Sequence, residues 1–172
     1  DGNLGYHVLL DCGDNCDDEG CTNDSGDVND DSLVNILDIV ILANYILGSG
    51  NLDECEFAGG DLNSDGIINI LDIVAIAGII LDSRVGDATH GQLIRSSNAL
   101  NLEANGYIGG VQMTLQHGAD FSIKMTNQAM VADYRTVGNE TKLVIVVPGS
   151  EELFTYTGDF EIVDMIVANS VG

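Results

Sequence analysis

Two strongly apolar stretches dominate the first half of the chain, from Ile36 to Leu47 and from Ile70 to Leu81. Their apolar residues recur at helical spacing and leave neither side of the helix polar. In the first stretch, one face carries Ile36, Ile39, Val40, Ala43 and Ile46, and the other carries Leu37, Ile41, Tyr45 and Leu47. A helix that is apolar all round is expected to be buried on both sides. We therefore expect each helix to pack against its sister on one side, and against the rest of the chain or another molecule on the other.

The period changes after Asp82, where apolar and polar residues begin to alternate as they do in strands. Strands are expected around Val111, Met113 and Leu115, around Phe121, Ile123 and Met125, and at 98–104, 129–136, 142–147, 152–157 and 160–168, with a hairpin turn at Val137-Gly138-Asn139-Glu140. Short strands separated by turns indicate an antiparallel β-sandwich of immunoglobulin-like or cohesin-like kind, so the fold class is α+β. The count of about seven strands is small for a complete cohesin-type sandwich and predicts an open edge.

A further strand is predicted at the start of the chain, where Leu4, Tyr6, Val8 and Leu10 alternate with other residues. This strand could fold back onto the sandwich of its own chain. It could instead complete the sandwich of the next subunit, which is a head-to-tail arrangement that generates fibres when it does not close. The second alternative predicts a homopolymer.

An internal repeat organises the helical half. The segment GDVNDDSLVNILDIVILANYIL, beginning at Gly26, aligns with GDLNSDGIINILDIVAIAGIIL, beginning 34 residues later at Gly60. Each copy is a polar loop that runs into an apolar helix, so the unit is loop plus helix, duplicated.

Each loop carries oxygen-bearing residues at the spacing of an EF-hand calcium loop. Ca²⁺ takes six to eight oxygen ligands, and such loops supply them from positions 1, 3 and 5, from the backbone carbonyl of position 7, often through water from position 9, and from position 12. Mg²⁺ fits less well, because it demands a smaller octahedron and keeps its waters. The sequence therefore predicts two calcium ions, one held by Asp27, Asn29, Asp31, Leu33 (carbonyl), Asn35 and Asp38, the other by Asp61, Asn63, Asp65, Ile67 (carbonyl), Asn69 and Asp72.

Position 6 of such a loop requires a sharp turn, which glycine with a positive φ normally supplies. Gly66 meets this requirement in the second loop, whereas the first loop has Ser32. A residue other than glycine in that conformation costs about 1 kcal/mol or more. We therefore expect the first site to be the weaker or more distorted one.

These loops and helices resemble the type I dockerin over residues 26–82. Both loops end in aspartate at position 12, and the helix ends Tyr45-Ile46-Leu47 and Ile79-Ile80-Leu81 are similar to the closing motif of that family. The resemblance implies two calcium ions, approximate two-fold symmetry between the repeats, and docking onto a cohesin, which is a β-sandwich. The sequence as a whole predicts three segments: an N-terminal strand with a cysteine-rich acidic stretch (1–25), a dockerin-like repeat pair (26–86) and a β-sandwich module (87–172).

The chain departs from well-known dockerins at positions 10 and 11 of each repeat. Those dockerins have small and partly polar recognition residues there, whereas this sequence has Ile36-Leu37 and Ile70-Leu71. The departure argues against a standard cellulosomal cohesin as the partner.

Charge limits the possible partners. The chain has 28 Asp or Glu against 5 Lys or Arg, a formal net charge of −23, which disfavours binding to nucleic acid or to an anionic membrane. No run of 18 apolar residues occurs, because Asp38 and Asp72 interrupt the two most apolar stretches, so no membrane span is expected. Cations are the natural ligands.

The cysteines favour an oxidising compartment. Cys12, Cys16, Cys21 and Cys55 form an even set, as disulfides do in small exported proteins, and three pairings are open. Zinc is the alternative, but the C-x3-C-x4-C spacing lacks the usual C-x2-C pair. The start at Asp1 indicates a mature form or a start inside a longer precursor. We expect an extracellular or cell-surface location, with glycan acceptor sequons at Asn23 and Asn139.

No set of residues in the sequence indicates catalysis. His7, His90 and His117 are isolated, and the acidic residues are accounted for as calcium ligands or solvated charges. We therefore predict a structural or assembly subunit, not an enzyme, which joins copies of itself by strand exchange. The alternative is an adaptor whose dockerin docks onto a separate cohesin while its β-module binds carbohydrate or protein.

Overall fold

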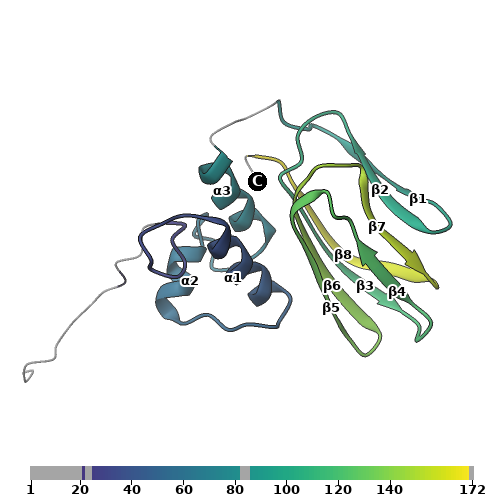
Figure 1. The fold of residues 1–172 in the computed structure, drawn as a ribbon, viewed down its shortest axis with the longest axis horizontal. Helices are drawn as coiled ribbons and strands as arrows, with labels where there is room; N and C mark the ends of the chain where they lie inside the picture. The colour runs from purple at the N-terminus through teal and green to yellow at the C-terminus, as the bar shows by residue number, and fades with distance from the viewer. Residues whose placement is uncertain (1–20, 22–24, 82–85, 171–172) are drawn as a thin grey trace, which may run out of the picture.

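The computed structural model of the chain describes residue 21, residues 25–81 and residues 86–170. Within this part of the chain, three helices precede eight strands (Figure 1), as expected for an α+β fold. The helices are α1 (Ile36–Ile46), α2 (Glu54–Gly60) and α3 (Ile70–Leu81). The strands are β1 (Gly91–Arg95), β2 (Ala99–Ala104), β3 (Gly110–His117), β4 (Ser122–Met125), β5 (Ala129–Val137), β6 (Glu140–Pro148), β7 (Glu152–Thr157) and β8 (Phe160–Ala168).

The strands form two four-stranded antiparallel sheets. One sheet has the order β1-β2-β7-β4 and the other has the order β5-β6-β3-β8. Side chains alternate between the two faces of a strand. In β6, Leu143 and Ile145 therefore point between the sheets, while Val144 and Val146 point to the outer face. Because all four are fully buried, both faces of this strand are covered.

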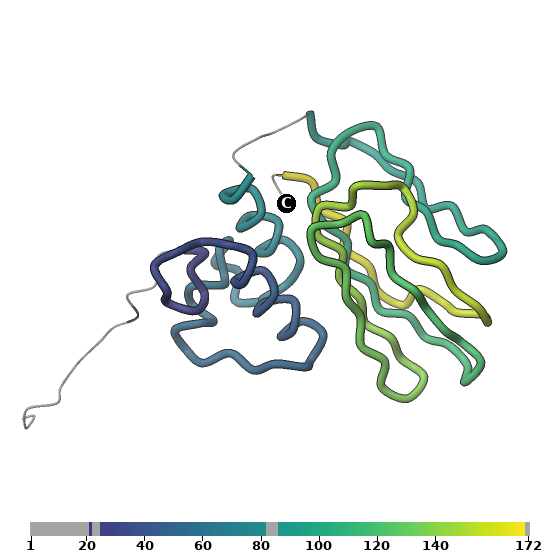
Figure 2. Tube along the Cα trace, in the orientation of Figure 1, coloured from purple at the N-terminus to yellow at the C-terminus, as the bar shows by residue number. Residues whose placement is uncertain are grey.

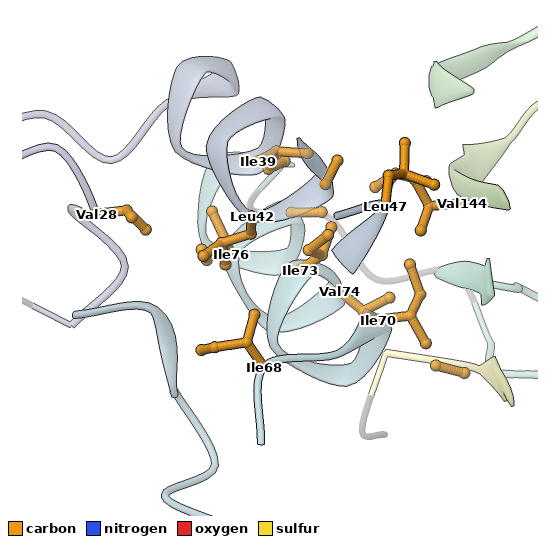
Figure 3. Packing of buried hydrophobic residues seen from close by; sticks show 14 residues of the cluster. Val28, Ile39, Leu42, Leu47, Ile68, Ile70, Ile73, Val74, Ile76 and Val144 are labelled. Carbon is orange, nitrogen blue, oxygen red and sulfur yellow. The ribbon is translucent and has the colours of Figure 1, made fainter. Parts of the chain in front are cut away.

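The helices cover the outer face of the sheet β5-β6-β3-β8, and α3 lies nearest to it (Figure 2). Ile70 and Val74 of α3 share one buried cluster with Val144, Val146 and Ala168 of the sheet (Figure 3). A second cluster, which includes Phe154 and Met113, fills the space between the two sheets. The order of layers is therefore helices, sheet, sheet.

Most of the expected elements are confirmed. Both apolar stretches are helices, seven strands lie where the alternation predicts them, and β5 and β6 are joined at the expected hairpin turn. The described residues contain an eighth strand, β1, one more than the count of about seven that was expected. With two sheets of four strands each, the strand count no longer argues for a missing strand.

Helix α2 was not expected from apolar periodicity. It begins at an N-cap, Asp53, whose side chain accepts hydrogen bonds from the backbone of Cys55 and Glu56, while the Glu56 side chain accepts one from Asp53 N at 2.8 Å. This capping box satisfies backbone donors at the helix start. At its end, a Cβ on Gly60 would lie 2.7 Å from Leu42 Cδ2, so glycine allows α2 to approach α1 closely.

Several predicted features lie outside the described residues or stay untested. The predicted N-terminal strand (Leu4 to Leu10), Cys12, Cys16 and Asn23 lie outside the described residues. Asn139 lies in the exposed turn between β5 and β6, and its glycosylation stays a prediction. Among the described helices, none has the length and apolarity that crossing a bilayer requires.

Candidate metal centre

The two predicted loops end in matching helix caps. Asn35 is the N-cap of α1: its side chain accepts a hydrogen bond from Leu37 N at 2.8 Å, and Asp38 Oδ2 accepts one from Asn35 N at 2.8 Å. Asn69 and Asp72 make the same pair of bonds at the start of α3. Positions 9 and 12 of each loop therefore satisfy backbone donors that a helix start leaves unpaired.

The position-12 aspartates also tie the end of each loop to its beginning. Asp38 Oδ1 accepts hydrogen bonds from Val28 N at 2.9 Å and Asn29 N at 3.4 Å. Asp72 Oδ1 does the same with Leu62 N at 3.1 Å and Asn63 N at 3.5 Å. Both aspartates are fully buried. Each loop is therefore closed into a ring by one buried carboxylate.

Positions 1, 3 and 5 curl toward one another. Asp27 accepts hydrogen bonds from Asp31 N at 3.1 Å and from Ser32 N at 2.7 Å, while Asn29 Oδ1 accepts a second bond from Asp31 N. The second loop repeats the pattern, with Asp61 accepting from Asp65 N and Gly66 N and with Asn63 accepting from Asp65 N. Side chains of alternate residues thus gather on one side of the backbone.

The carbonyl of position 7 faces the same side. Leu33 O accepts a hydrogen bond from Asn35 Nδ2 at 3.1 Å, and Ile67 O lies 3.4 Å from Asn69 Nδ2. The side chains of Leu33 and Ile67 are 64% and 62% exposed, so they point away from the loop. The structure therefore links all six predicted positions of each loop in one hydrogen-bond network.

The oxygen donors of each loop fit a hard cation. Carboxylate, amide and carbonyl oxygens are the ligands that Ca²⁺ prefers. In the described residues, no three His, Cys, Asp or Glu side chains gather closely enough to hold a metal by themselves. The amide and backbone oxygens of positions 3, 7 and 9 would therefore have to complete each site. Which oxygens bind, and how many ions, stay predictions.

Electrostatics in the second loop favour a bound cation. Burial raises the pKa of Asp72 above its ordinary value, and the neighbouring carboxylates of Asp61 and Asp65 raise it further, against the lowering effect of its backbone hydrogen bonds. A divalent cation bound in this loop would offset the repulsion between these carboxylates and stabilise the charged form of Asp72.

Position 6 has a positive φ in both loops, 68° at Ser32 and 81° at Gly66. The serine therefore adopts the left-handed conformation that the sequence analysis assigned to this position. A Cβ on Gly66 would meet no atom within 4 Å, so glycine serves backbone conformation there and not packing. The strain predicted for the first loop is confirmed in its geometry, while weaker binding at that loop stays a prediction.

These matched positions allow a paired test of the strain. Ser32→Gly is expected to stabilise the calcium-loaded protein by about 0.5–1 kcal/mol, because relief of the left-handed strain exceeds the entropy that glycine adds to the unfolded chain. Gly66→Ser is expected to destabilise it by a similar amount. Chemical denaturation in calcium measures both, and substitutions that change stability in the same direction would contradict this account.

A disulfide joins the two repeats. Cys21 and Cys55 are bonded, with their Cα atoms 5.1 Å apart and a separation of 34 positions in sequence. That separation equals the repeat period, so the two cysteines occupy equivalent positions ahead of the two loops. Of the three pairings that were open, the structure has one that contains Cys21–Cys55. The 34-residue period of the repeat is the sequence signal for this pair.

Comparison with protein families gives a match for the segment that contains both loops. The matching family is described as Dockerin type I domain, and the match covers residues 25–81. Residues 25–81 form a dockerin type I domain. Neither the curated proteins nor the solved structures provided a match to the chain. The dockerin domain supports calcium binding and a cohesin-docking role in extracellular assembly.

The dockerin domain of this chain shares its core with the β part. Gln112 of β3 accepts a hydrogen bond from Ile70 N, the first backbone amide of α3, at 3.1 Å. Arg135 of β5 donates a hydrogen bond to the carbonyl of Gly48, just after α1. The antiparallel sheets at residues 91–168 are consistent with a β-sandwich module. These cross-contacts were not signalled by the sequence, because nothing local in it marks Gln112 or Arg135.

Proposed function

We propose that the chain is a calcium-stabilised, non-enzymatic assembly subunit of the cell exterior, whose dockerin domain docks onto a cohesin-type β-sandwich of another protein. The match of residues 25–81 to the dockerin type I domain carries this proposal. Calcium would bind both loops and hold the starts of α1 and α3 in place. The β-sandwich would act as a rigid support for the dockerin domain.

The apolar surface of α1 supports docking. Leu33, Ile36, Leu37 and Val40, which we call the α1 patch, are between 38% and 64% exposed. Ile36 and Val40 are one helical turn apart and share one side of α1, whereas Leu37 lies on the adjacent side and Leu33 lies in the preceding loop. Contiguous apolar surface on a protein rimmed by polar residues is typical of an interaction site.

Binding to immobilised type I cohesin modules from several scaffolding proteins tests the proposal. The full chain is expected to bind at least one of them in calcium and to lose binding in excess chelator. The matched control is the double variant Asp31→Ala/Asp65→Ala, which removes one predicted ligand per loop and is expected to weaken calcium-dependent binding. Binding that ignores both chelation and this variant would contradict the calcium-dependent part. Failure to bind any module would contradict docking onto type I cohesins.

A second candidate function is polymerisation by strand exchange. Strand β8 is an edge strand on which Ile162, Val163, Met165 and Val167 are exposed, and an exposed apolar edge can accept another strand. The donor would be residues 4–10 of a second copy. Sedimentation of the full chain should then show polymers, and deletion of residues 1–10 should abolish them. Polymers that persist after the deletion would exclude this donor.

A further inference from the structure

The two repeats carry one surface of identical sequence in two different environments. Asn35–Val40 and Asn69–Val74 both read NILDIV. In α3, Ile70 is 0% exposed and Val74 is 2% exposed. In α1, the equivalent Ile36 is 40% exposed and Val40 is 38% exposed. Because the sequence is the same, the difference comes only from what covers each copy.

The sheet β5-β6-β3-β8 covers the α3 copy. The part of the sheet surface that contacts Ile70 and Val74 is called the seat. A Cβ on Gly109 would lie 2.5 Å from Val74 Cγ1, and one on Gly110 would lie 2.6 Å from Ile70 Cγ1. Only glycine at both positions lets these two helix side chains reach the backbone of the sheet. Val144, Val146 and Ala168 line the rest of the seat, as the close-up in Figure 3 shows for Val144 beside Ile70.

The α1 copy has no such cover among the described residues. Near the end of α1, Leu47 lies toward Val144 (Figure 3) and Arg135 bonds to Gly48 O. The α1 patch lies at the N-terminal end of the helix and in the loop that precedes it. The surface that α3 buries on a sheet is thus left open on α1.

Charge argues against a second copy of the chain as the occupant. Residues 25–81 contain ten Asp or Glu and no Lys or Arg, so two dockerin domains repel each other. The seat on the sheet of a second copy is also filled by its own α3. A different protein, with a sheet face that is apolar at its centre and basic at its rim, would avoid both the charge repulsion and the competition with α3.

Resting on the proposed function, we infer that the α1 patch is the only docking face that this dockerin domain presents. The α1 patch binds the outer sheet face of one cohesin-type β-sandwich, as α3 packs against the sheet of its own chain. On α3 the equivalent pair, Ile70 and Val74, is covered in cis, while Ile67, the equivalent of Leu33, stays exposed. The chain therefore binds one such partner at a time, in one orientation.

Thiol labelling of the free, full-length chain tests the occupied face without any partner. Val40→Cys and Val74→Cys introduce a cysteine at equivalent positions of the two repeats. With a maleimide, the cysteine at position 40 is expected to react on the order of 100-fold faster than that at position 74, which reacts only on local opening. Equal rates would mean that the α3 face is free, which overturns the inference. That result would leave cohesin docking by the chain untouched.

Binding to a type I cohesin module tests the open face. A 1:1 complex is expected, with an affinity that falls by on the order of 100-fold in Leu37→Glu, because a charge cannot be buried in an apolar interface without a partner. The control, Ile79→Glu, alters a side chain of α3 that is 52% exposed and lies outside the patch, and it should bind as the unaltered chain does. Two modules per chain, or unchanged binding of Leu37→Glu, would overturn the single face.

Two further outcomes separate the inference from the proposed function. If no cohesin module binds while the labelling rates differ as expected, cohesin docking fails and the cis-occupied face stands. If the free chain dimerises in sedimentation and Leu37→Glu abolishes the dimer, a second copy is the occupant and the assigned partner is wrong.

Discussion

Replacing Asp72 by alanine is expected to destabilise the dockerin domain by about 3 kcal/mol or more, both with and without calcium. Asp72 is fully buried and accepts hydrogen bonds from the backbone of Leu62, Asn63 and Asn69. Without its carboxylate, these donors lose their partner and the loop is no longer closed onto the start of α3. Chemical denaturation in calcium and in chelator measures the effect.

Asp65→Ala is the matched control. Asp65 lies in the same loop at position 5, but it is exposed and its carboxylate accepts only local bonds, from Ile67 N and the Asn63 side chain. This variant should lose stability in calcium, because it loses a predicted ligand, and should lose far less in chelator. Equal losses for Asp65→Ala and Asp72→Ala in chelator would contradict the closing role of Asp72.

Removing the disulfide is expected to cost about 4 kcal/mol in the variant Cys21→Ser/Cys55→Ser. The bond closes a loop of 34 residues that contains the whole first calcium loop and α1. A cross-link of this kind acts mainly by restricting the unfolded chain, so the loss should be similar with and without calcium. The free energy of unfolding from denaturant curves measures it.

The control for the disulfide prediction is a titration of free thiols in the variant. It shows whether Cys12 and Cys16 are free thiols or paired when Cys21 and Cys55 are replaced. A loss below about 1 kcal/mol, or one that appears only in chelator, would contradict the prediction.

The repeat allowed much of the helical half to be predicted. Loop positions 1, 3, 5, 9 and 12 recur in both copies, and the structure joins them through matching hydrogen bonds because the same short side chains cap the same backbone amides. Alternation located seven strands. Strand β1 was missed because Gln92 and Arg95 interrupt a segment with only two apolar residues. Helix α2 was missed for its lack of periodicity, although Asp53 and Glu56 have capping-box spacing.

The burial of the two NILDIV segments could not be predicted, because identical residues cannot tell which copy is covered. The burial of Ile70 and Val74 depends on Gly109 and Gly110, which are distant from α3 in sequence and contact it in the folded chain. The expectation that each helix is covered on both sides is met within the chain by most of α3. At the start of α1 the second side is exposed, so its cover by another molecule stays a prediction. Helical periodicity reports how apolar a surface is and not which surface it meets.

The central claim is that the paired loops of the dockerin domain are calcium sites, and metal analysis of the protein after dialysis tests it most directly. The chain is first saturated with calcium and then dialysed against calcium-free buffer without chelator. We predict about two calcium ions per chain, one per loop. A content near zero, with the domain still folded, would contradict the assignment of both loops.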